Sequence, residues 1–170
     1  PILANIYMHY VLMWWFKERI QPALRGFSGI VVYADDFVVC FQYKSDAESF
    51  YESLKKRMGH FGLSLEEEKS RLIEFGRYAE SNRAKRGESK PETFDFLGFT
   101  HYCSHGKSGK FRVKRKTSRK KFSHKCKEVH KLIGEMRTLP VKEIVKKLNQ
   151  ILVGYYHYYG ITDNSKAIAS

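Results

Sequence analysis

The chain has 170 residues, of which 42% are hydrophobic, so it is long enough to form one domain or two small ones around a real core. It contains no apolar run of the roughly 18–20 residues that a membrane-spanning helix needs. The net charge is +13, and twelve Lys or Arg but only one acid lie between His105 and Lys131. Such a concentration is typical of nucleic-acid binders, although a solvated charged helix or an anionic membrane contact would also explain it.

Helical spacing of apolar residues predicts a first helix over residues 5–24, which Pro22 and Gly26 would end. Its apolar face is predicted to carry Ile6, Tyr10, Met13, Trp14 and Ile20, and Trp15 and Phe16 widen this face, so that most of the helix is expected to be buried. A second helix is predicted to begin at a capping box, Ser45 to Glu48, and to close at Gly62. Its apolar stripe is predicted to contain Ala47, Phe50, Leu54, Met58 and Phe61.

Two acidic residues, Asp35 and Asp36, stand between the apolar runs 30–32 and 37–41. The runs are rich in β-branched and aromatic residues, so they predict a β-hairpin within a buried sheet, with both carboxylates at its tip. Paired carboxylates are suitable ligands for Mg²⁺, and two such ions can clamp the oxygens of a phosphoryl transfer. An ordinary solvated turn is the competing interpretation of the same residues.

Farther along the chain, short strands are predicted at residues 63–65 and 71–75, and an exposed loop at residues 77–93. Residues 94–99 resume an apolar alternation. They are predicted to pair, through Cys103, with the strand at residues 111–113 across a turn at residues 106–109.

The remainder is predicted to be helical. Thr117 or Ser118 would begin a basic helix that extends to about Arg137, and Pro140 would begin another. The basic helix is predicted to pack through Phe122, Cys126, Val129, Ile133 and Met136. The second helix ends in a tyrosine cluster at residues 154–160, which would serve core packing, base stacking or both.

The predicted fold class is therefore α+β: a mainly antiparallel sheet packed on helices over residues 1–114, followed by an all-α basic region over residues 115–170. The three cysteines, Cys40, Cys103 and Cys126, are odd in number and lack the spacing of a zinc site. They predict reduced thiols and a cytoplasmic protein, which we expect to be bacterial.

Several blocks, taken in order, resemble the carboxy-terminal half of a reverse transcriptase of the group II intron maturase kind. Residues 1–7 are similar to the segment that follows the family's template-and-nucleotide motif, and Tyr33 to Asp36 resembles its catalytic hairpin. Residues 62–72 and 94–99 resemble its next two motifs, the second being the primer-grip strand. Residues 116–120 and 148–160 resemble its thumb, or maturase X domain.

The resemblance implies roles for individual residues. Asp35 and Asp36 would be catalytic and would bind metal, and Lys69 would protonate the departing pyrophosphate or neutralise its charge, although it could also be an ordinary solvated lysine. Leu97, Gly98 and Phe99 would position the primer, and a β-bulge is the alternative explanation for the glycine. A basic surface would follow the nucleic acid, and it would consist of Lys114, Arg115, Lys116, Arg119, Lys120 and Lys121.

The resemblance further implies Mg²⁺ as cofactor, and as partners an RNA template or intron RNA, a primer DNA and dNTPs. The family's third metal-binding Asp and its fingers would precede Pro1. We therefore expect the chain to be part of a longer protein, to associate with that upstream segment, and to be inactive by itself.

Three functions remain open from the sequence. The first is RNA-directed DNA polymerisation by two-metal phosphoryl transfer. The second is an RNA-binding maturase module that assists intron splicing without polymerisation. The third is a basic RNA- or DNA-binding protein in which the Asp pair is only a turn.

Overall fold

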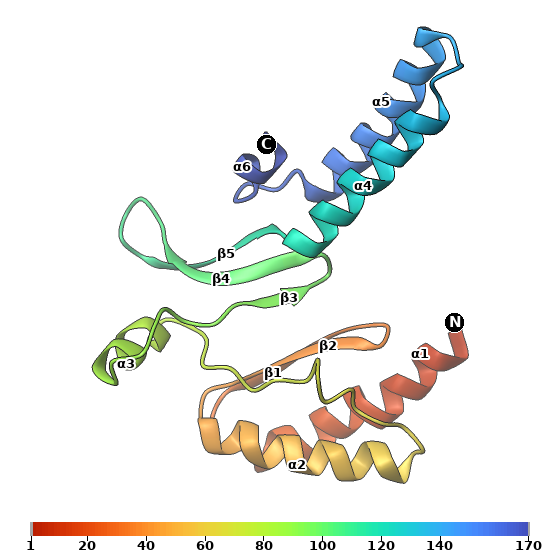
Figure 1. Cartoon of the computed structure of the whole chain (residues 1–170). Helices are drawn as coiled ribbons and strands as arrows, with labels where there is room; N and C mark the ends of the chain where they lie inside the picture. The colour runs from red at the N-terminus through yellow and green to blue at the C-terminus, as the bar shows by residue number, and fades with distance from the viewer. Residues whose placement is uncertain (1, 170) are drawn as a thin grey trace. The chain divides into compact units, whose positions relative to one another are not determined.

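The computed structural model describes residues 2–169, and the chain divides into two compact units, Pro1–Ile73 and Glu74–Ser170 (Figure 1). We call them the first and the second unit and consider each by itself. Antiparallel sheets combine with helices, and a helical region ends the chain, so the predicted α+β class is confirmed. None of the helices formed by residues 2–169 is long and apolar enough to cross a membrane. The three cysteines are free.

The first unit begins with a continuous helical segment. It starts as α1 (Ile2–Met8), continues in π-helical turns (His9–Trp14 and Phe16–Ile20) and ends in a 3₁₀ turn (Gln21–Ala23). The predicted helix is therefore present, but its predicted face is only partly correct: Trp15 and Phe16 are buried, whereas Ile6, Tyr10 and Trp14 are 45–59% exposed. Val11 and Leu12, which the prediction did not place on this face, complete the buried side. The sequence is apolar on all sides there, so periodicity could not select the face that packs.

Strands β1 (Ser28–Tyr33) and β2 (Asp36–Phe41) form the predicted antiparallel hairpin. Its side chains alternate, so that one face packs on the helical core. The residues on that face are Ile30, Val32, Phe37, Val39 and Phe41. The other face is open, since Val31 and Tyr33 are 59% and 64% exposed. Within the first unit the predicted sheet is therefore buried on one face only.

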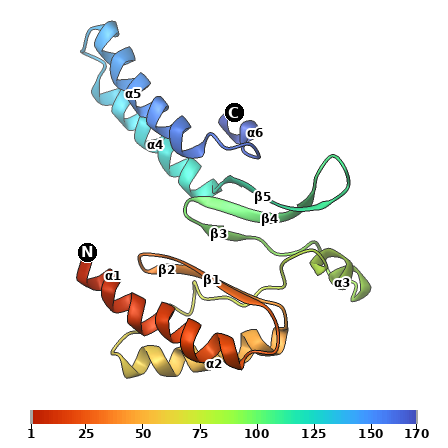
Figure 2. The ribbon, with the colours of Figure 1, turned by 180° about the vertical axis from the view of Figure 1, so that it is seen from behind.

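Helix α2 (Lys44–His60) lies beside the helical segment that starts at α1, and the two are on the same side of the hairpin (Figure 2). Phe50, Leu54 and Met58 are buried, as the stripe predicts. The capping box is wrong, because the helix begins before Ser45 and no side chain caps it. Asp46, at the centre of that tetrapeptide, instead accepts hydrogen bonds from the backbone N–H groups of residues 25 and 26.

The end of α2 follows the prediction. Gly62 has φ +68°, its N–H donates to the carbonyl of Gly59, and the N–H of Leu63 donates to the carbonyl of Met58. These bonds form a Schellman motif. The strands predicted at residues 63–65 and 71–75 are absent from the described chain, where β1 and β2 pair only with each other. An apolar run without a neighbouring strand cannot form a ladder.

The second unit begins with a helix that the sequence did not predict. α3 (Ala79–Lys85) lies inside the predicted loop 77–93. It has no apolar stripe, and polar side chains around it supply the stabilising contacts. Arg86 bonds to the carboxylates of both Glu74 and Glu88, and Asn82 donates to Glu74. Periodicity cannot detect a helix that is held in this way.

Strands β3 (Phe94–Phe96), β4 (Phe99–His105) and β5 (Phe111–Thr117) form an antiparallel sheet in that order. The predicted pairing is confirmed, since Cys103 lies opposite Val113. The chain then forms the antiparallel helices α4 (Arg119–Glu135) and α5 (Val141–Tyr159), followed by the short α6 (Ser165–Ile168) (Figure 1).

The predicted stripe of α4 is only partly correct. Met136, just after the helix, is buried, and Phe122 and Val129 are half-buried, but Cys126 and Ile133 are exposed. The two helices cover each other and little else, so the packed stripe is narrower than the apolar pattern.

Candidate functional site

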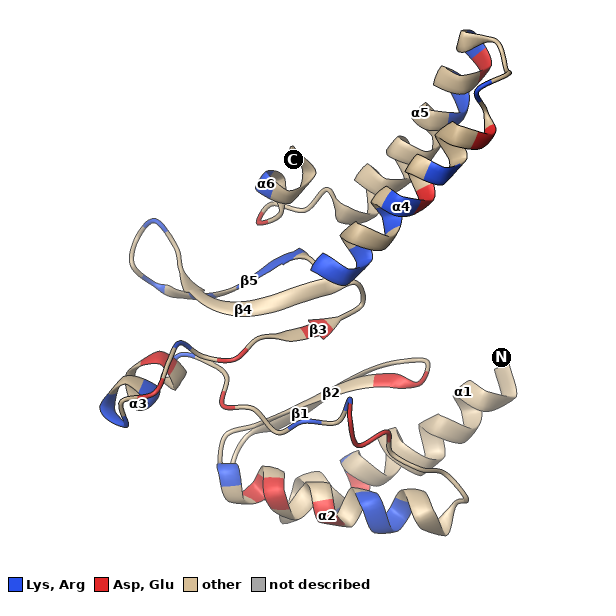
Figure 3. Ribbon diagram, viewed as in Figure 1, with Lys and Arg blue, Asp and Glu red and all other residues tan. Residues whose placement is uncertain are grey.

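The tip of the β1–β2 hairpin carries the acidic pair. Tyr33 pairs with Asp36, so Ala34 and Asp35 form the turn between the strands. Both aspartates are exposed, and they form the acidic end of the hairpin in Figure 3. Ala34 has φ +53°, a left-handed conformation that an L-residue with a Cβ adopts at a cost. The hairpin thus holds two adjacent carboxylates on a short, strained turn, outside the apolar layer.

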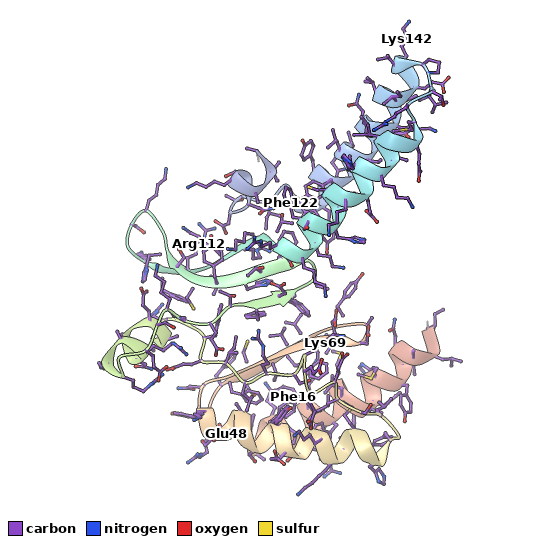
Figure 4. The ribbon with its side chains drawn as sticks, viewed as in Figure 1. Phe16, Glu48, Lys69, Arg112, Phe122 and Lys142 are labelled. Carbon is purple, nitrogen blue, oxygen red and sulfur yellow. The ribbon has the colours of Figure 1, made fainter. Side chains whose placement is uncertain are left out.

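Lys69, labelled in Figure 4, lies in the same unit as this pair and interacts electrostatically with both aspartates. It follows a turn in which the carbonyl of Glu66 accepts the N–H groups of Lys69 and Ser70. The Lys69 ammonium lies 2.6 Å from the carboxylate of Glu66. Glu66, and then Asp36 and Asp35, raise the pKa of Lys69, so the side chain stays positively charged. The fold therefore places the three predicted catalytic residues in one unit, within electrostatic range of one another, and the residue that Lys69 contacts directly is Glu66, which the sequence did not single out.

The donor set of this turn matches Mg²⁺ in kind, because carboxylate oxygens are the ligands that hard cations prefer. The turn supplies two of these carboxylates, those of Asp35 and Asp36. Within residues 2–169, no group of three or more His, Cys, Asp or Glu side chains is arranged to hold a metal ion. Asp35 and Asp36 can thus contribute part of a metal site.

The second predicted site, Leu97 to Phe99, lies in the other unit, at the tight turn between β3 and β4. Leu97 and Gly98 have φ +49° and +76°, and Phe96 pairs with Phe99 across them. The turn is therefore a two-residue hairpin loop rather than a β-bulge. Ala34 and Leu97 are the non-glycine residues with positive φ in the described chain. Each stands at one of the two turns that the sequence singles out.

The end of α5 packs directly on this turn. The hydroxyl of Tyr158 donates to the carbonyl of Leu97 at 2.9 Å. Phe99, only 9% exposed, stacks on Tyr158 with ring centres 5.7 Å apart and contacts Tyr159 at 5.1 Å. Burial raises the pKa of the Tyr159 hydroxyl. Part of the tyrosine cluster therefore serves packing, one of the two roles expected from the sequence.

The sequence analysis missed Asn164, which is 1% exposed. Its side chain accepts the N–H of Thr117 at 2.7 Å and donates to the hydroxyl of Thr117 and to the carbonyl of Tyr159. An Asn after a helix is ordinarily a turn residue, so its sequence position gives no signal of this role.

The six predicted nucleic-acid-binding cations lie on β5 and the first turn of α4, and Figure 3 shows them along these elements. Lys114 is half-buried, whereas the other five are exposed. Strand alternation places Lys114 and Lys116 on one face of β5 and Arg115 on the other. The six cations are nearly continuous in the sequence, but in the structure they are divided between the two faces of β5 and the first turn of α4.

A groove of about 400 Å³ lies between α4 and α5. Lysines, a histidine and tyrosines line it, among them Lys121, His124, Lys125, Tyr155 and Tyr158. Cations beside aromatic rings are the combination that tracks a nucleic-acid backbone and stacks bases, although Tyr158 is exposed here and Tyr155 is half-buried. Glu128 lies 3.2 Å from both His124 and Lys125 and offsets part of the positive charge.

An acidic hairpin in an α+β unit, a basic sheet and a basic helical pair define a nucleic-acid-binding protein with a polymerase-like carboxylate turn. Comparisons with known families agree with this description. Residues 1–101 match the family described as reverse transcriptase (RNA-dependent DNA polymerase), and residues 119–170 match the group II intron, maturase-specific domain. A comparison with curated protein sequences gives no match.

Because the first match covers more than half of the chain, the chain belongs to the reverse transcriptase family, in its group II intron maturase branch. The resemblance found in the sequence motifs is thereby confirmed. The family consists of RNA-directed DNA polymerases, binds nucleic acid and typically uses Mg²⁺.

Proposed function

We propose that the protein synthesises DNA on an RNA template. The observation that supports this most directly is the strained turn that presents Asp35 and Asp36 near the ammonium of Lys69. In the proposed reaction, the 3′-hydroxyl of a primer attacks the α-phosphate of a dNTP, and pyrophosphate leaves. Residues 1–114 would form part of the polymerase palm, and residues 115–170 the thumb.

The side chains divide this work. Asp35 and Asp36 would hold Mg²⁺ together with a further carboxylate, and the bound ions would stabilise the attacking and leaving oxygens. Lys69, which neighbouring carboxylates keep protonated, would donate a proton to pyrophosphate or neutralise its charge. Leu97, Gly98 and Phe99 would position the primer strand.

The test is primer extension on an RNA template by the intact protein. Asp35→Asn and Asp36→Asn each remove a charge without changing the side-chain volume, and we expect either to abolish DNA synthesis while RNA affinity stays unchanged. Glu52→Gln, at an exposed position of α2, makes the same chemical change away from the turn and should leave synthesis intact. Full activity of both Asp variants would overturn the proposal.

A second function, support of intron splicing, is favoured by the maturase-specific match over residues 119–170. In this role the basic surface would hold folded RNA while the RNA carries out the chemistry. The basic surface would serve both functions, whereas the aspartates would serve polymerisation alone, so the Asp35→Asn and Asp36→Asn variants should still support splicing. Loss of splicing together with synthesis would show that the functions are not separable.

The basic surface has a test of its own. Charge reversal at Lys114, Lys116, Arg119 and Lys120 should weaken RNA binding and flatten its salt dependence by about one unit of slope per lost phosphate contact. Reversal of four exposed lysines elsewhere changes the net charge equally and provides the control: Lys17, Lys44, Lys56 and Lys90. Equal loss of affinity in both variants would show that the effect comes from net charge alone.

We also propose that the 170-residue chain does not polymerise DNA by itself. The family resemblance calls for a third metal-binding carboxylate and for fingers residues that bind the triphosphate, and the sequence analysis assigned neither to this chain. Template-dependent extension by the chain alone, with Mg²⁺ and dNTPs, would contradict this. Since its substrates are dNTPs and RNA, we place the intact protein in the cytoplasm.

A further inference from the structure

The Leu97–Gly98 turn has a backbone conformation that its own sequence does not favour. A two-residue hairpin loop with positive φ at both positions is ordinarily formed by Asn-Gly or Asp-Gly, because a branched side chain crowds its own backbone there. Leu97 nonetheless has φ +49°. Contacts from outside the turn must therefore hold it in this conformation.

Those contacts come from the two helices of the second unit. The Tyr158 hydroxyl donates to the Leu97 carbonyl at 2.9 Å, and the Ser118 N–H donates to the Gly98 carbonyl, also at 2.9 Å. The Ser118 hydroxyl bonds Asp95 at 2.7 Å, just before the turn. Both carbonyls of the turn are thus occupied by donors from the ends of α5 and α4.

The opposite side of the turn is closed by Tyr159. A Cβ at position 98 would lie 2.8 Å from the Tyr159 hydroxyl, so only glycine fits. Asn164 then ties the carbonyl of Tyr159 to Thr117 at the end of β5. The turn, the end of β5 and the end of α5 are therefore one hydrogen-bonded assembly.

This arrangement leaves the amide groups of the turn available. Within residues 2–169, the N–H groups of Leu97 and Gly98 donate to no other group, whereas both carbonyls are bound. Backbone N–H groups presented together are well suited to a phosphate oxygen. The ligand that this turn can take is therefore an anionic nucleic-acid backbone.

We propose that Tyr158 is a positioning residue: by holding the Leu97 carbonyl, it fixes the turn so that the amides of Leu97 and Gly98 meet a phosphate of the primer strand. This inference rests on the proposed polymerase function. It also means that the thumb helix α5 sets the position of the primer through a hydrogen bond as well as through its charge.

The test is Tyr158→Phe in the intact protein, which removes the hydroxyl but keeps the ring that stacks on Phe99. Since one hydrogen bond is lost, the KM for primer–template should rise about fivefold while kcat stays the same. Tyr156→Phe, an identical change at another exposed tyrosine of α5, should alter neither value. An unchanged KM for Tyr158→Phe would overturn the proposal.

A double-mutant cycle separates positioning from general packing. Asn adopts left-handed conformations readily, so in a Leu97→Asn background the turn needs less external support. We expect Tyr158→Phe to raise KM less in that background than in the wild type. An equal effect in both backgrounds would show that Tyr158 acts in some other way than by holding the turn.

The failure of this inference can be distinguished from failure of the proposed function. If the wild-type protein extends no primer, the polymerase proposal fails, and the turn is then assessed by amide hydrogen exchange. Loss of the Tyr158 hydroxyl should speed exchange of the Ser118 amide, which donates to the Gly98 carbonyl, about fivefold. Unchanged exchange would refute the positioning role whatever the activity.

Discussion

Replacement of Asn164 by Ala provides a direct test of how the second unit is held together. The side chain is 1% exposed and makes three hydrogen bonds, two with Thr117 and one with the carbonyl of Tyr159. Each such bond contributes about 1 kcal/mol net, so together they contribute about 3 kcal/mol. The N–H of Thr117, itself buried, would lose its acceptor, so water is poorly placed to compensate.

Amide hydrogen exchange at Thr117 measures this loss where it occurs. A change of about 3 kcal/mol corresponds to exchange about two orders of magnitude faster in Asn164→Ala than in the wild type. Asn149→Ala, the same substitution at an exposed position of α5, should leave the Thr117 exchange unchanged. Both tryptophans, Trp14 and Trp15, lie in the first unit, so denaturation followed by fluorescence should be unaffected by either substitution.

Acceleration of less than about fivefold at the Thr117 amide, equivalent to about 1 kcal/mol, would refute the reasoning. It would mean that the three bonds are replaced by solvent at no great cost, and that Asn164 does not join the end of α5 to β5.

Three further predictions concern other parts of the chain. Leu54→Ala should destabilise the first unit by about 3 kcal/mol, measured by tryptophan fluorescence in urea, because the side chain is 2% exposed and leaves a cavity. Gly62→Ala should cost about 1 kcal/mol in the same assay, since φ is +68° although nothing obstructs the added methyl. Arg86 lowers the pKa of Glu74 and of Glu88 below the ordinary 4.5. The stabilisation that these two carboxylates give the α3 segment is therefore present above that pH and is lost as acid protonates them. Proteolysis of the α3 segment should therefore accelerate on acidification below about pH 4.5, and this acceleration should be smaller in Arg86→Ala, where Asn82 and Arg83 still contact the two carboxylates.

The parts of the fold that the sequence predicted are those whose partners are local. The β1–β2 hairpin, the β4–β5 pair and the Schellman motif at Gly62 each depend on residues a few positions apart, so their signal is contained in a short window. The start of the basic helix after Ser118 was predicted for the same reason.

The failures depend on partners that a short window cannot reveal. Residues 63–65 and 71–75 have strand-like composition, but the β1–β2 hairpin offers them no third position in the described chain. Asp46 was interpreted as part of a cap, whereas it bonds the backbone some twenty residues away. Asn164 bonds Thr117, 47 positions earlier in the chain, so no local pattern identifies it.

The candidate site shows the same division. Asp35, Asp36 and Lys69 were named from motifs, and the first unit brings them together. The role of Glu66 could not be inferred from the sequence, because it depends on a turn that points its carboxylate back at Lys69. The tyrosine cluster was recognised as a group, but only the fold separates Tyr158, which bonds the Leu97 carbonyl, from its neighbours.

The two strained residues connect these observations. Ala34 and Leu97 have positive φ in different units. The conformational free energy that each of these residues costs would be reduced by a glycine or an asparagine at the same position. In both turns the strain fixes the direction of the groups on either side: the carboxylates of Asp35 and Asp36 in one, the backbone amides of Leu97 and Gly98 in the other. With a flexible residue in the turn, these groups would sample several orientations. A site that binds metal or phosphate loses affinity when its ligand groups must be ordered on binding. The stability lost at these turns is therefore offset by contacts elsewhere. In the first unit these are the apolar core between the π-helical turns after α1 and helix α2, and in the second unit the Tyr158–Asn164 assembly.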